Sequence, residues 1–355
     1  MKEETHNGRI AFWKFAFCLL ICAFHLGSLF ETTKIRFAGG SIAVEFFFLV
    51  SGFLFCKKMI NYNGKDAFED NIKYTWHSIK RFAPYIIFLF VISVCFSKFV
   101  LNYRLLDFLY AFYSILLIPA KTPDIIHVYD IAWYISVLIV VRFALFPLLA
   151  KYKKKYSLYF APIVAFLLLG YLLIEYEYVV GPWTEDVFTY KSVVRGFMEI
   201  NIGIFLYEVC EKFKNIKFNK FSRFLLTIIE TFGYVSIFIL CNKSDPHTKY
   251  NALMIMLLFS SIMISFSGLS LFNDFFNKKV FFYLEKLSLP MYINNWFIIL
   301  LVNYLLGLLG YNLVYYQTLI ITFLVLIVVG IIELFIINLF EKNKSKIAKL
   351  FITEK

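Results

Sequence analysis

A lysine and a histidine near the start of the chain are the residues best placed to do chemistry. Lys14 and His25 stand in one apolar stretch. Their spacing is about three helical turns, or roughly 16 Å, so both side chains project from one face at different membrane depths. Imidazole is a general base near neutral pH, and an ionisable group inside a bilayer is a functional candidate by default. Taken alone, Lys14 could equally well extend to the lipid headgroups, and His25 could equally well form a hydrogen bond with a neighbouring helix.

A glutamate opens the next apolar stretch. Glu45 starts a run of aromatic residues that ends in Ser51 and Gly52, a small pair that lets another helix come close. If the two stretches cross a membrane in opposite directions, His25 and Glu45 both lie in its outer half. A carboxylate there would orient the imidazole and stabilise its protonated form. The sequence therefore predicts a catalytic His25–Glu45 pair, with the phenylalanines at 46–48 interpreted as facing lipid.

Later apolar stretches carry further charged and polar residues. Lys80 and Arg81 stand at the start of one stretch, as basic residues commonly do on the cytoplasmic side. Arg142, Arg195 and Glu199 lie inside apolar stretches, where we expect them to face a cavity or one another. The remaining candidates, all in or beside apolar stretches, are Trp133, Ser136, Tyr292, Asn294 and Asn295.

The composition indicates the class of protein that must position these residues. Hydrophobic residues make up 61% of the 355, and aromatic residues 21%, far more than a soluble core needs. The net charge of +12 could suggest a nucleic-acid partner, but most of the 36 Lys and Arg fall in alternate loops, as the positive-inside rule requires. The six cysteines form no CxxC pair, so we expect neither a disulfide framework nor a metal site. The sequence predicts an all-α integral membrane protein with no nucleic-acid partner.

The apolar runs and the basic loops together predict the topology. The runs lie at 10–30, 38–56, 82–101, 104–118, 130–150, 156–174, 192–209, 222–241, 250–272, 286–306 and 316–340. The Lys-rich segments 57–81 and 151–155 both belong in the cytoplasm, so an even number of crossings separates them. Of the three runs between them, 104–118 is the shortest, and we assign it as a re-entrant or interfacial helix. This gives about ten transmembrane helices, cytoplasmic termini, and one transmembrane domain over 1–355 whose first stretch is a retained anchor.

In this order, the motifs resemble those of the membrane acyltransferase-3 family. That family begins with a basic residue, ten intervening residues and a histidine, and here lysine replaces the usual arginine. The resemblance covers essentially the whole chain, and its strength lies in the order of several weak motifs. Two departures are Asn295, where the family often has histidine, and Val137-Leu138, where it often has a glutamate pair. The matching positions are Lys14 and His25, Glu45 to Leu54, Arg81 to Pro84, Trp133 and Ser136, Arg195 and Gly203, and Ser288 and Tyr292.

The resemblance implies transfer of an acyl group, usually acetyl, from cytoplasmic acyl-coenzyme A to a hydroxyl of an outward-facing sugar or lipid-linked glycan. It places the protein in a bacterial cytoplasmic membrane, with acyl-coenzyme A as co-substrate and no metal. His25 would be the general base oriented by Glu45, with an acyl-histidine intermediate left open. Basic residues would hold the coenzyme A phosphates, namely Lys14, Lys80, Arg81 and Arg142. The oxyanion or acceptor side would be lined by Trp133, Ser136, Arg195, Glu199, Tyr292 and Asn295.

Two other functions remain open at this stage. Intramembrane lysine, histidine, glutamate and arginine also suit a proton-coupled transporter or exporter of a small acid or lipid-linked sugar, although we see no inverted repeat. A non-catalytic scaffold among polysaccharide-assembly proteins would tolerate substitution of Lys14, His25 and Glu45. The sequence also leaves open whether the acceptor is capsule, exopolysaccharide, teichoic acid or a metabolite. It likewise leaves open whether the group is acetyl or succinyl and whether the protein forms a homo-oligomer.

Overall fold

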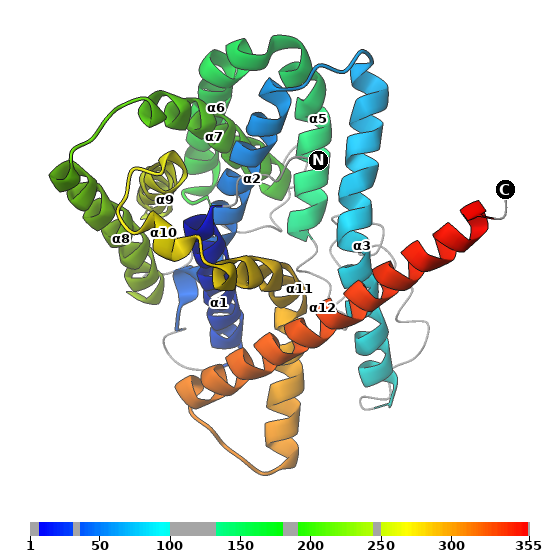
Figure 1. Cartoon of the computed structure of the whole chain (residues 1–355). Helices are drawn as coiled ribbons and strands as arrows, with labels where there is room; N and C mark the ends of the chain where they lie inside the picture. Colours follow the sequence, from blue (N-terminus) through cyan, green and yellow to red (C-terminus); the bar gives the residue numbers. More distant parts are fainter. Residues whose placement is uncertain (1–6, 31–35, 100–132, 180–190, 244–249, 354–355) are drawn as a thin grey trace.

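The computed structural model describes residues 7–30, 36–99, 133–179, 191–243 and 250–353, and over these the chain is helical without strands (Figure 1). The α-helices are α1 (Gly8–Leu29), α2 (Ala43–Ile60), α3 (Ala67–Phe99), α5 (Trp133–Lys155), α6 (Ala161–Tyr176), α7 (Lys191–Lys214), α8 (Lys220–Lys243), α9 (Tyr250–Ser267), α10 (Asn273–Phe276), α11 (Lys279–Leu308) and α12 (Tyr315–Thr353). A 3-10 helix, η1 (Ala38–Ile42), precedes α2, and a π-helical turn, η4 (Tyr156–Phe160), joins α5 to α6.

The described residues contain 8 helical segments long and apolar enough to cross a membrane. This confirms the prediction of an all-α membrane protein. One of these segments runs from Trp133 to Tyr176 and bends at Lys153, whose φ is 41°. The helix α7 is not among the 8, because it carries charged residues along its length. The count of ten crossings and the cytoplasmic termini therefore stay predictions, and the segment 104–118 lies outside the described residues.

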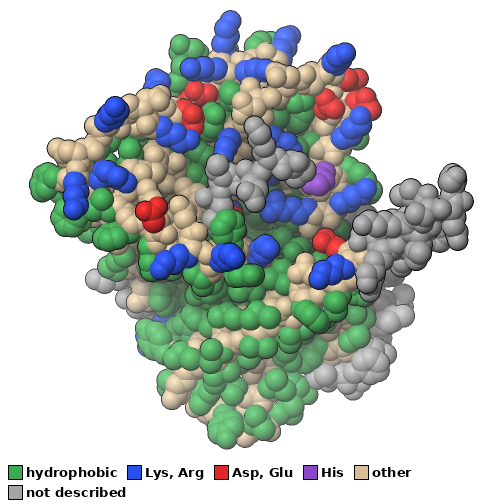
Figure 2. Space-filling view, viewed as in Figure 1, with side chains coloured by type: hydrophobic (Ala, Val, Ile, Leu, Met, Phe, Trp, Pro, Cys, Tyr) green, Lys and Arg blue, Asp and Glu red, His purple; other side chains and the backbone are tan. Residues whose placement is uncertain are grey.

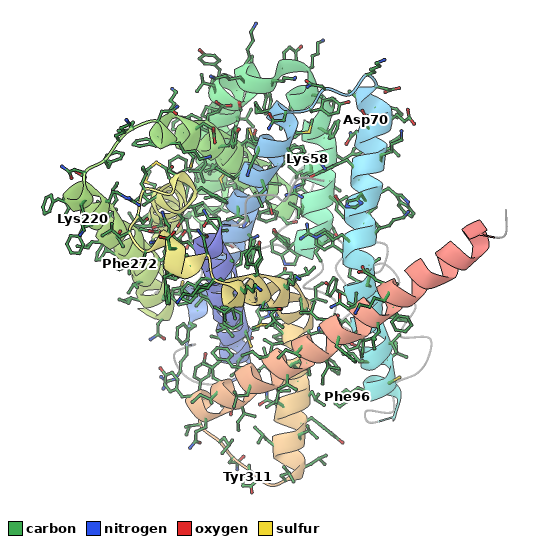
Figure 3. The ribbon with its side chains drawn as sticks, viewed as in Figure 1. Lys58, Asp70, Phe96, Lys220, Phe272 and Tyr311 are labelled. Atoms are coloured by element: carbon green, nitrogen blue, oxygen red, sulfur yellow. The ribbon has the colours of Figure 1, made fainter. Side chains whose placement is uncertain are left out.

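The surface divides into a basic and an apolar part. Figure 2 shows Lys and Arg side chains gathered over the upper half of this face and hydrophobic side chains over the lower half. The labelled residues follow the same division, since Lys58 and Asp70 lie near one end of the molecule and Phe96 and Tyr311 near the other (Figure 3). Large apolar side chains stay exposed along the candidate spans, among them Phe166 on α6. An apolar belt below a basic rim is the surface that a bilayer requires.

Two glycines allow α2 and α7 to touch along their backbones at the centre of the fold. A Cβ atom on Gly52 would lie 2.3 Å from the Ile200 carbonyl oxygen, and one on Gly203 would lie 2.2 Å from the Leu49 carbonyl oxygen. Both distances are far shorter than a carbon–oxygen contact allows. The small residue at position 52 thus permits the close helix approach that the sequence predicts, and α7 is the helix that uses it.

Helices α1 and α11 lie side by side and run in the same direction. Three residues spread over three turns of α1 each contact a residue of α11, and the contacted residue lies 270 or 271 positions later in every case. The constant offset shows that the two helices are parallel. Lys14 and His25 are the first and last of these α1 residues, which confirms that they share one face. The three contacts are the ion pair Lys14–Glu285, the Cys18 Sγ to Ser288 carbonyl bond of 3.0 Å, and the His25 to Asn295 bond of 2.7 Å.

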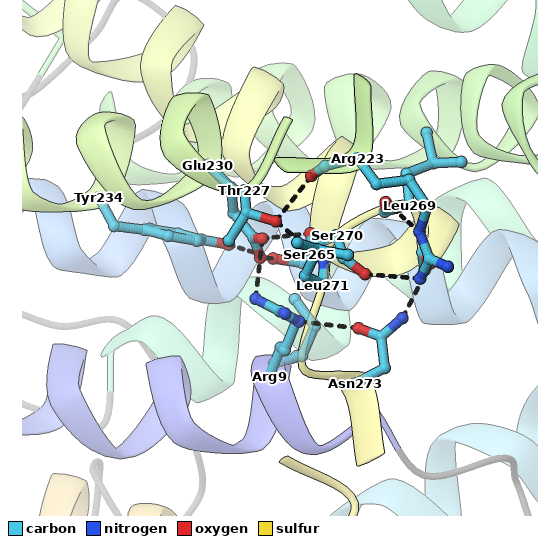
Figure 4. Close-up of polar contacts among 12 residues, drawn as sticks. Arg9, Arg223, Thr227, Glu230, Tyr234, Ser265, Leu269, Ser270, Leu271 and Asn273 are labelled. Atoms are coloured by element: carbon cyan, nitrogen blue, oxygen red, sulfur yellow. Dashed lines mark hydrogen bonds and ion pairs between the residues drawn. The ribbon is translucent and has the colours of Figure 1, made fainter. Parts of the chain in front are cut away.

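A buried ion pair fixes the start of α1 (Figure 4). The Arg9 guanidinium donates through Nη1 to Glu230 on α8 at 2.9 Å and through Nε to Asn273 on α10 at 2.9 Å. The hydroxyls of Ser265 and Ser270 also donate to the Glu230 carboxylate. Glu230, at 1% exposure, therefore receives one charged and two neutral donors. This cluster, which we call the Arg9 cluster, ties α1 to α8 and to the α9–α10 connection.

Candidate active site

The imidazole of His25 is held by an amide. His25 lies half-buried near the end of α1, and its Nδ1 is 2.7 Å from Oδ1 of Asn295. The amide nitrogen of Asn295 is already used, because it donates to the Tyr292 carbonyl at 2.5 Å. Asn295 therefore presents an acceptor to the ring, and we assign the proton of neutral His25 to Nδ1. This leaves the lone pair of Nε2 available as a base, with the indole of Trp296 edge-on to the ring at 5.3 Å.

A second buried group joins one arginine to two glutamates. Arg195 Nη2 donates to Glu45 Oε2 at 2.5 Å, and Arg195 Nε donates to Glu199 Oε1 at 3.1 Å. All three side chains are 1% exposed or less. The indole ring of Trp133 lies beneath the guanidinium, 5.3 Å from its central carbon. We call these four residues the Arg195 cluster, and they confirm that Arg195 and Glu199 face one another.

The Arg195 cluster has more acceptors than donors. Glu45 Oε1 and Glu199 Oε2 are buried and receive no hydrogen bond from an N–H or O–H donor among the described residues, and the two carboxyl groups lie close enough to share a proton. Lys191 lies one turn before Arg195, but its ammonium donates to the Tyr178 carbonyl at 3.0 Å. Two carboxylates thus share one paired cation in a dry environment. Such a group binds a proton, or accepts hydrogen bonds from a ligand, more readily than a fully paired one.

The predicted His25–Glu45 pair is not formed. Glu45 sits in the first turn of α2 on the side that meets α7, so its carboxylate bonds to Arg195. His25 faces α11 instead, and Asn295 takes the orienting position expected of Glu45. The interpretation of the phenylalanine run as facing lipid is also wrong, because Phe46 and Phe48 are fully buried. Phe48 packs against Tyr134, with ring centroids 4.5 Å apart.

The basic residues expected to hold coenzyme A do not form one cluster. Lys14 is paired with Glu285, whereas Lys80 and Arg81 are exposed on α3. Arg142 donates through Nη2 to the Ser51 carbonyl at 2.9 Å, and its Nε is buried without a partner in the described part of the chain. It lines a small pocket between α3 and α5, together with Tyr74, Thr75, Ser78, Phe82, Leu138 and Ile139.

Comparison with known proteins identifies the chain. A family model described as an acyltransferase domain, that of acyltransferase-3, matches residues 7–338. The chain belongs to the acyltransferase-3 family. It is therefore a membrane acyltransferase, and the resemblance read from its motifs is confirmed. Searches of curated proteins and of solved structures give no match.

The remaining candidates of this acyltransferase lie between His25 and the Arg195 cluster. The Tyr292 ring packs against Tyr134 at 5.6 Å, and its carbonyl fixes Asn295 as described above. Tyr134 in turn lies beside Phe48, which neighbours Trp133 at 6.1 Å. Ser136 is buried on α5, and no direct contact with His25 is found within the described ranges. Aromatic side chains therefore lead from the Arg195 cluster to Tyr292, and the Tyr292 carbonyl and the Asn295 amide complete the path to His25.

One buried acid of this acyltransferase, on the helix beside α11, was not among the residues predicted from the sequence. Glu333 on α12 is fully buried and accepts a bond from Asn294, the neighbour of Asn295. A single glutamate in the middle of the most apolar stretch was the available signal, since intramembrane acids are functional candidates. The ion-pair partner of Lys14, Glu285, carried no such signal, because it lies in a polar segment.

Proposed function

We propose that this acyltransferase transfers an acyl group, acetyl in the first instance, from cytoplasmic acyl-coenzyme A to a hydroxyl of an extracytoplasmic or lipid-linked carbohydrate. The observation that carries the proposal is the Asn295-held imidazole, whose Nε2 lone pair is left available as a base. The family supports acyl transfer in general. Our proposal adds the identity of the donor, the class of the acceptor and the roles of individual residues.

His25 acts as the general base. Its Nε2 takes the proton of the acceptor hydroxyl while that oxygen attacks the thioester carbonyl carbon. The carbon–sulfur bond then breaks, and the imidazolium returns the proton to the departing thiolate. One ester and one thiol form from one alcohol and one thioester. Asn295 keeps the proton of the neutral ring on Nδ1 throughout, a role that the sequence reasoning had given to Glu45.

The donor is proposed to enter from the basic side of the molecule. Coenzyme A carries several negative phosphate charges, and Lys80 and Arg81 are exposed cations on α3. Arg142 lines the small pocket between α3 and α5, and its buried Nε donates to no acceptor among the described residues. The basic half in Figure 2 is then the cytoplasmic half, and the predicted topology assigns both termini to the cytoplasm as well.

The acceptor is proposed to bind at the Arg195 cluster. The unpartnered oxygens of Glu45 and Glu199 can accept hydrogen bonds from sugar hydroxyls, and the Trp133 ring offers an apolar face for a sugar ring. All of these residues lie near helix ends that the predicted topology places outside. The aromatic contacts through Tyr134 lead from this region to Tyr292, whose carbonyl holds the Asn295 amide beside His25.

The test is acetyl-coenzyme A turnover by the purified protein with a carbohydrate acceptor. His25→Ala should lower kcat on the order of 10²–10⁴-fold, because the general base is lost. His77→Ala is the matched control, since His77 is exposed on α3 and should leave turnover unchanged. A folded His25→Ala protein with normal turnover would reject the proposal. A wild-type protein that neither binds nor cleaves acyl-coenzyme A would favour a transporter.

A further inference from the structure

Glu333 is a buried acid that the proposed chemistry does not use. It lies in α12, inside the candidate span Tyr315–Lys342, and is fully buried. Its Oε2 accepts a hydrogen bond from Nδ2 of Asn294 at 2.6 Å. Within the described ranges, no lysine or arginine forms an ion pair with it. An ionised carboxylate in such a place costs free energy unless a cation pairs with it. We therefore ask whether Glu333 is protonated.

Two buried atoms without a hydrogen-bond partner among the described residues indicate that Glu333 is protonated. Oε1 of Glu333 and Oδ1 of Asn294 are both buried acceptors without a donor in the described structure. Oε1 is the second oxygen of the carboxyl group and Oδ1 is the oxygen of the amide group, and the 2.6 Å bond already joins these two planar groups through their other polar atoms. The Asn294 amide nitrogen also donates to the Pro290 carbonyl at 2.9 Å, so both of its hydrogens are used. One proton on Glu333 would let Oε1 donate to Oδ1, so that the acid and the amide each donate to the other and accept from it. Both unsatisfied acceptors would then be satisfied by one proton.

The position of Asn294 links this pair to His25. Asn294 and Asn295 are consecutive on α11, so their side chains point about 100° apart, one toward α12 and one toward α1. Pro290 lies inside α11 one turn earlier, and Figure 1 shows that α11 changes direction along its length. A proline removes one helix bond and loosens the coupling between the two halves. The rotation of the later half is therefore set by what its side chains hold.

We propose that Glu333 is a positioning residue: as a neutral acid paired with Asn294, it fixes the rotation of α11 that aims Asn295 at His25. This role rests on the proposed function, because its purpose is to keep the base in its reactive tautomer. It predicts that the hydrogen-bonding capacity of residue 333 matters and that its negative charge does not.

Two substitutions separate these properties. Glu333→Gln keeps one donor and one acceptor in the same plane, so kcat should stay within about threefold of wild type. Glu333→Met has similar size but no hydrogen bond, and misplacing His25 should lower kcat about 10²-fold. Glu341→Met is the matched control, because Glu341 is exposed on the same helix and should change nothing. Asn294→Leu should reproduce the loss and replaces Glu333→Met if that variant does not fold.

Coupling to Asn295 distinguishes positioning from a general packing role. If Glu333 acts through Asn295, the double variant E333M/N295L should lose no more activity than N295L alone, whereas additive losses would overturn the proposal. Equal losses in Glu333→Gln and Glu333→Met would show that the charge is needed, and normal turnover in folded Glu333→Met would show that the residue is idle. Either result overturns the proposal.

An infrared measurement tests the neutral acid without using activity. The difference between the wild-type and Glu333→Gln spectra should contain the carbonyl stretch of a protonated carboxylic acid, because only wild type carries the acid at position 333. If Glu333→Gln leaves the spectrum unchanged, the neutral acid is wrong even when His25→Ala is inactive. If the band is lost but His25→Ala remains active, the proposed function fails and the acid pair stands.

Discussion

Two buried arginine–glutamate groups in this protein differ in how completely they are paired. In the Arg9 cluster, one carboxylate, Glu230, faces one guanidinium and two hydroxyl donors. In the Arg195 cluster, one guanidinium faces two carboxylates, and one oxygen of each carboxylate lacks a partner in the described structure. Both groups are buried, and Arg9 Nη2 also lacks a hydrogen-bond partner in the described structure, so the contrast concerns the carboxylates. Burial alone therefore does not separate a structural ion pair from a candidate binding site.

The difference lies in what each group still has to offer. The Glu230 carboxylate is saturated by donors from α1, α9 and the α9–α10 connection, so it joins helices and has no capacity for a ligand. The Arg195 cluster retains acceptor atoms beside an aromatic ring, which is a common arrangement for binding a polar molecule. Glutamate-to-glutamine substitution should therefore cost much more stability in the Arg9 cluster than in the Arg195 cluster.

The largest effect is expected from Glu230→Gln. This change leaves the buried Arg9 guanidinium without its counter-charge, and breaking a buried pair in this way costs about 3–5 kcal/mol. The free energy of unfolding in detergent should fall by that amount, while kcat per folded molecule stays near wild type. Glu69→Gln is the control, because the Glu69–Lys73 pair is exposed and should contribute less than about 1 kcal/mol. A stable Glu230→Gln protein would contradict a structural role for the Arg9 cluster.

An intermediate effect is expected from Gly203→Ala, which attacks the Arg195 cluster through the backbone. The new methyl group would meet the Leu49 carbonyl oxygen, forcing α2 and α7 apart and lengthening the contact between Glu45 and Arg195. Overpacking of this kind costs about 1–3 kcal/mol, and kcat/KM for the acceptor should fall as well. Gly170→Ala in α6 is the control, because nothing lies within 4 Å of its new methyl. Equal stability of both variants would rule out a tight α2–α7 contact.

The parts predictable from the sequence are those that depend on one helix at a time. The length of the apolar runs gives membrane helices, and the helical period places Lys14 and His25 on one face, as the contacts with α11 confirm. Arg195 and Glu199 are four residues apart on α7, so their pairing also follows from the helical period.

The parts that were missed depend on which helix lies beside which. Glu45 meets Arg195 and not His25 because α2 packs on α7 through facing glycines, a contact between residues far apart in the sequence. The bond from Asn294 to Glu333 likewise needs α11 beside α12. The helical period predicts which residues share a face of a helix but not which other helix packs against that face. The Glu45–Arg195 and Asn294–Glu333 contacts therefore could not be predicted from the sequence.

The smallest effect is expected from Glu199→Gln. With one cation for two buried carboxylates, we expect the Arg195 cluster to hold a proton already, and glutamine resembles the protonated acid. Its carbonyl oxygen can still accept from Arg195 Nε, so the free energy of unfolding should change by less than about 1 kcal/mol. Measured beside Glu230→Gln under the same conditions, this variant isolates the effect of pairing from that of burial. If Glu199→Gln proved as damaging as Glu230→Gln, both carboxylates would have to be ionised, and the unpartnered oxygens would need a bound cation to explain them.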